Sequence, residues 1–142
     1  MNLNKWSIIL GSVAAVALAG AAQAERTLTY GSYLSATHAT NKTSVEPWIK
    51  AVEEETNGSL KINLMADGTI IGAKDAVAGV RDNLVDMAMI VDFYTPNELK
   101  SSTLLTELGL LGTDEAVMLG AVNEMQLLNC PSCIREAAEN NM

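Results

Sequence analysis

The segment at residues 66–90, ADGTIIGAKDAVAGVRDNLVDMAMI, contains the turn and helix signals that decide the fold. Its glycines and lysine invite comparison with a phosphate-binding loop, which needs four residues between two glycines and then Gly-Lys-Ser/Thr. Only three residues separate Gly68 from Gly72. Asp75 follows Lys74 where a hydroxyl is required, and its carboxylate would repel phosphate. We therefore interpret the glycines as turn residues that join a strand to a helix.

The segment lies within an alternation of strands and helices. Alternating β-formers predict strands at residues 26–30 and 60–65, and the nearly continuous apolar run at residues 85–91 predicts a third strand, covered on both faces. A turn at Asp67-Gly68, a helix over residues 73–82 and a cap at Asn83 connect the last two strands.

A further helix is expected between the first two strands, because apolar residues recur there at a spacing of three and four. It begins at a capping box formed by Thr43 and Glu46, or nearer Thr40, in which case Pro47 would kink it. Asn57-Gly58 is its stop signal, since glycine suits the left-handed position after a last turn.

Two more helices are expected at residues 114–128 and 132–139, whereas the pattern at residues 97–112 is mixed. The resulting order, β-α-β-α-β-α, predicts an α/β fold with a doubly wound parallel sheet. Ligands of such sheets bind beyond the carboxyl ends of the strands.

Six side chains in the loops after these strands are candidate ligand contacts. They comprise aromatic rings, hydrogen-bonding groups and one cation, which together suit half of a small-molecule cleft. The candidates are Tyr33, His38 and Asn41 after the first strand, Lys74 after the second, and Asp92 and Tyr94 after the third. Ser32 and Phe93 lie in the same loops.

The first 24 residues have the features of an export signal. Lys5 precedes an uncharged run at residues 6–21, and Ala22-Gln23-Ala24 is a small-x-small cleavage site. We expect cleavage after Ala24 and a soluble periplasmic protein; the alternative is a retained membrane anchor.

The charge balance and the few histidines and cysteines limit the chemistry. The chain has 17 acidic and 9 basic residues, which argues against a nucleic-acid partner. His38 is its single histidine, so we expect no metal, no cofactor and no enzymatic activity. For Cys130 and Cys133 we favour a local disulfide, and thiol–disulfide catalysis is the alternative.

Residues 48–89, WIKAVEEETNGSLKINLMADGTIIGAKDAVAGVRDNLVDMAM, resemble the DctP-type solute-binding proteins of tripartite ATP-independent periplasmic (TRAP) transporters. The matching elements are Thr56-Asn57-Gly58, residues 68–72 and residues 83–87. Ile71 replaces the usual leucine and Asn83 a glycine, and asparagine also tolerates left-handed geometry.

The resemblance implies a two-lobed receptor that binds a small organic anion, often a carboxylate, and delivers it to the integral membrane subunits of a TRAP transporter. Residues 25–142 would form the N-terminal portion of the solute-binding domain, in a protein of about twice this length. The arginine that clamps the carboxylate would then lie in a later segment. The alternatives are a periplasmic binding or sensory lobe of another transport class, and an exported thiol oxidoreductase that uses Cys130 and Cys133.

Overall fold

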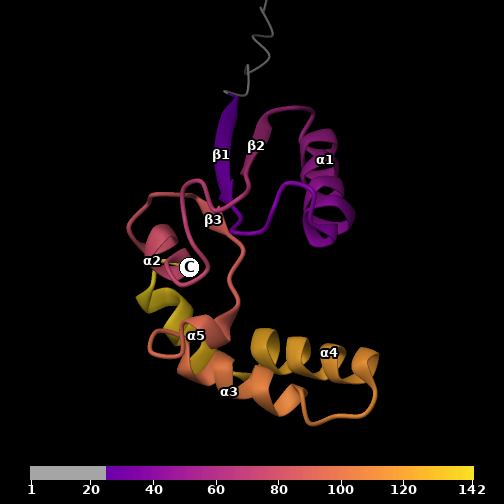
Figure 1. Ribbon diagram of the computed structural model, residues 1–142, viewed down its shortest axis with the longest axis vertical. Coiled ribbons are helices and arrows are strands. Elements are labelled where there is room, and N and C mark those ends of the chain that lie inside the picture. The colour runs from indigo at the N-terminus through magenta and orange to yellow at the C-terminus, as the bar shows by residue number, and fades with distance from the viewer. Residues whose placement is uncertain (1–24) are drawn as a thin grey trace, which may run out of the picture.

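The structure is a computed structural model that describes residues 25–142. A small parallel sheet with α1 beside it forms one end of the molecule, and α3 and α4 form the other (Figure 1). The predicted export signal lies outside the described residues. No helix in residues 25–142 is both long and apolar enough to cross a membrane.

The sheet has three strands in the order β2-β1-β3, and both pairings are parallel. The central strand β1 (Arg26–Gly31) pairs along its whole length with β2 (Leu60–Met65). On its other side it pairs with β3 (Met87–Ala88). The predicted α/β architecture with parallel strands is thus confirmed.

The third strand is much shorter than the prediction of residues 85–91, and its residues are only half-buried. It pairs with β1 only where Tyr30 faces Met87 and Gly31 faces Ala88. Before that point, the side chain of Asp86 accepts a hydrogen bond from the Thr29 amide at 2.8 Å, in place of a backbone carbonyl. Beyond it, β1 has already ended, so the apolar run has no strand to pair with. The length of β3 is therefore limited by the point at which β1 ends.

The helix between β1 and β2 begins near Thr40, not at the predicted capping box. Its first part is a π-helical turn, η1 (Asn41–Val45), which leads directly into α1 (Glu46–Glu55). The Thr43 hydroxyl donates to the Ala39 carbonyl at 2.9 Å, so it does not form the predicted capping box with Glu46. The widened turn directly precedes the segment that contains Pro47, which has no amide hydrogen to donate.

The predicted turn residues adopt the left-handed conformations that their types favour. Gly58 has φ 75° and donates to the Glu53 carbonyl at 2.8 Å, which ends α1. Asp67 and Gly68 have φ 62° and 63°, and Asn83 has φ 58°. The helix between Gly68 and Asn83, α2 (Ala76–Arg81), is shorter than predicted because residues 73–75 form a turn.

Ile71 is the centre of the small apolar core beside the sheet. Its side chain is 3% exposed and packs with Ala76 and Val85. A Cβ atom on Gly31 at the end of β1, or on Gly79 in α2, would lie only 2.6 Å from this side chain. The two glycines thus allow α2 to lie against the sheet with a single isoleucine between them.

The segment after β3 is helical. It comprises the short 3-10 turn η2 (Asp92–Tyr94), α3 (Lys100–Gly109), α4 (Glu115–Glu124) with its π-helical continuation η3 (Met125–Asn129), and α5 (Pro131–Glu139). The helices predicted at residues 114–128 and 132–139 are confirmed, and Asp114 caps the first by accepting from the Val117 amide. The segment that the sequence left unassigned contains α3.

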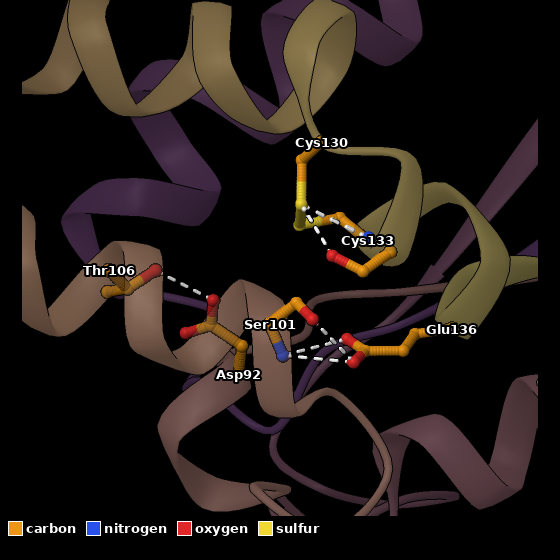
Figure 2. The surroundings of a disulfide bond; sticks show 7 residues. Asp92, Ser101, Thr106, Cys130, Cys133 and Glu136 are labelled. Atoms are coloured by element: carbon orange, nitrogen blue, oxygen red, sulfur yellow. Dashed lines mark hydrogen bonds between the residues drawn. A yellow bond between two sulfur atoms is a disulfide. The ribbon is translucent and has the colours of Figure 1, made fainter.

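Long-range hydrogen bonds join these helices to each other and to α2. The Glu136 carboxylate on α5 accepts bonds from the Ser101 amide at 3.0 Å and from its hydroxyl at 2.8 Å, at the start of α3 (Figure 2). The side-chain amide of Asn141 donates to the Arg81 carbonyl at the end of α2. The C-terminus therefore lies beside α2 (Figure 1).

Substitution of Gly79 tests the packing of Ile71. We expect Gly79→Ala to lower the free energy of unfolding by about 1–3 kcal/mol, because the new methyl group overpacks a buried contact. Gly120→Ala is the matched control, since Gly120 also lies within a helix and a Cβ atom added there would have no neighbouring atom within 4 Å. It should raise stability by up to about 1 kcal/mol. Chemical denaturation measures both, and an equal or better stability of the Gly79 variant would contradict the packing described.

Candidate functional site

The loops after β1 and β2 form one hydrogen-bonded unit at the carboxyl edge of the sheet. The Ser32 amide donates to the Met65 carbonyl at 2.9 Å, and the Gly68 amide donates back to the Ser32 carbonyl at 3.1 Å. The Asp67 amide donates to the Leu34 carbonyl at 2.8 Å. These bonds need the left-handed backbone at Asp67 and Gly68, because it turns both amides toward the first loop.

Asn41 organises the first loop from inside. Its side chain is fully buried, and its amide nitrogen donates to the carbonyls of Leu34 and Ser35 at 3.3 and 2.9 Å. Its amide oxygen accepts from the Ser32 hydroxyl at 3.1 Å. All of these bonds stay within the loop, so the structure gives Asn41 a positioning role. Its contact with a ligand stays a prediction.

Tyr33 and Tyr94 meet across the sheet edge, although they are far apart in sequence. Their ring centroids lie 6.2 Å apart at an interplanar angle of 86°, and Phe93 lies 4.7 Å from Tyr94. Tyr94 and Phe93 remain 42% and 47% exposed. Burial, followed by the nearby Tyr94, raises the pKa of the Tyr33 hydroxyl above its usual value, so this hydroxyl stays protonated at neutral pH.

Asp92 joins the third loop to the helical layer. Its carboxylate accepts a 2.7 Å bond from the Thr106 hydroxyl, and its carbonyl accepts one from the Thr103 hydroxyl at 3.0 Å. Both threonines lie on α3, and the carboxylate–hydroxyl bond is visible in Figure 2. Asp92 therefore fixes the position of the neighbouring aromatic residues relative to α3.

A sequence model of one family matches residues 30–127, which run from β1 into η3. Its description is "Bacterial extracellular solute-binding protein, family 7", with the short name DctP. This chain belongs to that family. The family expected from the resemblance is thus confirmed.

One solved family structure has a similar fold. It is a TRAP periplasmic solute-binding protein from Desulfovibrio salexigens, in an open complex with the C-terminus of a symmetry mate in its ligand-binding site. The TM-score is 0.52 and the identity 24%, which shows a shared fold. The match covers 58% of this chain and 25% of that chain, so our chain spans only part of the solved protein. No curated protein matches.

The remaining two candidates of the DctP-family chain do not join the tyrosine pair. His38 is exposed, and its Nδ1 accepts a bond from the Thr40 amide at 3.2 Å within its own loop. Lys74 is exposed and forms no ion pair within residues 25–142. Of the six residues, the structure therefore brings Tyr33 and Tyr94 together, uses Asn41 and Asp92 as supports, and leaves His38 and Lys74 apart.

Two cavities of about 570 and 410 Å³ lie in the helical part of the DctP-family chain. The larger is lined mainly by apolar residues of α4, η3 and α5, together with residues 90–92 and with Ser102 and Thr106 of α3. The smaller lies between α3 and α4. Neither includes Tyr33 or Tyr94 in its lining. The smaller cavity is a gap between helices, whereas the larger also reaches Asp92 in the loop after β3. The carboxyl-edge loops remain the site that the fold favours.

Cys130 and Cys133 form the expected local disulfide at the start of α5, with their Cα atoms 5.2 Å apart (Figure 2). Cys130 is 7% exposed and Cys133 is 4% exposed. A thiol–disulfide catalyst needs an accessible sulfur, so this burial argues against catalysis. Within the described part of the chain, no group of three or more His, Cys, Asp or Glu side chains could hold a metal ion.

The role of Asn41 can be measured directly. Asn41→Ala would remove three hydrogen bonds that hold the loop, one of them from the buried Ser32 hydroxyl, so we expect the free energy of unfolding to fall by about 2–4 kcal/mol. Asn63→Ala is the control, because Asn63 is exposed on β2; it should change stability by no more than about 0.5 kcal/mol. If denaturant titration gives the same small change for both variants, the buried amide does not hold the loop.

Proposed function

We propose that this chain forms the first ligand-binding lobe of an extracytoplasmic receptor that delivers a small organic anion to a TRAP transporter. The observation that carries this proposal is the family match over residues 30–127, which covers all three strands except the first residues of β1. The membrane subunits of the transporter would be its protein partners. The solved relative, described as a TRAP periplasmic solute-binding protein, supports this assignment.

The carboxyl-edge loops are the part of the chain that would receive the ligand. They present two tyrosine rings in edge-to-face contact, and the loops beneath them are tied together by backbone hydrogen bonds. Lys74 is exposed on the loop after β2 and would supply a positive charge for a carboxylate. The other proposed ligand-binding residues are His38, Asn41 and Asp92. Asn41 and Asp92 act mainly by holding their neighbouring residues in position.

Export supports the same function. A receptor for a periplasmic transporter has to cross the inner membrane, and residues 1–24 have the composition of a cleavable signal. We propose cleavage after Ala24 and a periplasmic location. The disulfide between Cys130 and Cys133 suits an oxidising compartment of this kind.

The ligand-binding proposal is tested on protein purified from the periplasm of the native host. We expect at least one compound in a thermal-shift screen of organic acids to raise the melting temperature, and calorimetry to give a dissociation constant in the micromolar range or below. Recombinant residues 25–142 should bind at least about 100-fold more weakly, because a bidentate guanidinium contact from a second lobe contributes about 3 kcal/mol or more.

Three results would contradict the proposal. If no organic anion shifts the melting temperature of the periplasmic protein, the ligand class is wrong. Equal micromolar binding by recombinant residues 25–142 would place the whole site in one lobe. A purified protein that binds organic anions but supports uptake without TRAP membrane subunits would indicate another transport class.

A further inference from the structure

Aromatic side chains are scarce in this chain, and they are concentrated at the carboxyl edge of the sheet. The sequence contains 1 phenylalanine, 2 tryptophans and 3 tyrosines, and three of these six residues are Tyr33, Phe93 and Tyr94. Tyr30 and Trp48 pair with each other where α1 lies beside the sheet. The three edge residues come from two separate loops, so the parallel order of the strands gathers them.

The three rings form a surface that is fixed in position but not covered. Tyr94 is in edge-to-face contact with both Tyr33 and Phe93, at centroid distances of 6.2 and 4.7 Å. Tyr94 nevertheless stays 42% exposed and Phe93 stays 47% exposed. Aromatic pairs stabilise a contact beyond the burial of apolar area, so a further ring that contacts this surface would gain a similar stabilisation.

The two tyrosine hydroxyls are available as donors. Neither hydroxyl bonds to a protein group within the described residues. Every buried polar side-chain atom there has a hydrogen-bond partner, so the unbonded Tyr33 hydroxyl must be accessible to solvent. A protonated phenol can donate to a carboxylate, and hydrogen bonds to a charged acceptor are stronger than neutral ones. The same surface thus offers apolar faces and donors to one ligand.

The charges of the surrounding loops disfavour a doubly charged ligand. Residues 31–40, 66–75 and 89–94 contain Asp67, Asp75 and Asp92 but only Lys74 as a cation, so their formal charge with His38 neutral is 1 − 3 = −2. Each additional negative charge on a ligand is therefore repelled by this lobe. Lys74 is the single cation of these loops, so a second carboxylate has no cation here.

We propose that the receptor binds a monocarboxylate that carries an aromatic ring, in preference to an aliphatic dicarboxylate. Its ring packs against Tyr94 and Phe93, and its carboxylate accepts from the Tyr33 hydroxyl. This inference rests on the proposed function, since it names the ligand class of the same site. The loops discriminate between the two ligand classes in two ways. Their aromatic surface attracts the ring of the monocarboxylate, and their net negative charge repels the second carboxylate of a dicarboxylate.

The test is calorimetry on the periplasmic protein with three probes: benzoate, hexanoate and succinate. We expect benzoate to bind at least about 10-fold more tightly than succinate, with hexanoate between them. Tyr94→Leu should weaken benzoate binding by about 3- to 10-fold, which corresponds to one aromatic contact. Tyr33→Phe should weaken benzoate and hexanoate alike. Trp48→Leu is the control, because Trp48 is similarly exposed, at 43%, and lies on α1; it should leave all affinities unchanged.

The outcomes separate this inference from the proposed function. Succinate binding that equals or exceeds benzoate binding, or unchanged benzoate affinity in the Tyr94 variant, overturns the inference while the receptor function stands. Absence of binding by every organic anion overturns both. Circular dichroism melting of each variant shows whether it is folded, and Tyr94→Phe provides a second, milder substitution that should retain benzoate affinity.

Discussion

The packing of Ile71 between two glycines is the constraint on which the binding edge depends. Gly31 ends the central strand and Gly79 lies in α2, and neither position has room for a side chain because Ile71 occupies the space. This contact brings the turn at Asp67 and Gly68 under the loop that follows β1, where its amides reach the carbonyls of Leu34 and Ser32. Asn41 adds side-chain hydrogen bonds within the first of these loops only.

The position of the aromatic residues follows from this arrangement. Tyr33 belongs to the loop that Asn41 and Gly68 fix, and Tyr94 belongs to the loop that Asp92 anchors on α3. α3 is in turn held at its start by Glu136 of α5, which begins at the disulfide. A chain of short-range contacts therefore runs from the core beside the sheet, through both loops, to the last helix. A surface built in this way needs little rearrangement when a ligand binds.

Local signals predicted much of the fold, and distant contacts account for what they missed. The turns at Gly58, Gly68 and Asn83 could be predicted because left-handed backbone favours glycine, asparagine and aspartate. The length of β3 could not, since it depends on where β1 ends. The amide and hydroxyl of Ser101 near the start of α3 bond to a residue 35 positions away, which no local pattern reveals. Likewise, strand order places Tyr33 near Tyr94, but sequence does not show that Asn41 is buried with its amide bonded inside the loop.

Native-state amide hydrogen exchange on the purified protein tests most directly whether the loops form one unit around Ile71. In the wild type, the amides of Ser32, Asp67, Gly68 and Met89 should be protected together, because each donates to the neighbouring loop or strand. Ile71→Val should lower the opening free energy of all four by the same amount, about 0.5–1.5 kcal/mol. Fast exchange of Asp67 and Gly68 beside a protected β1, or a loss confined to those two amides in the variant, would contradict the account.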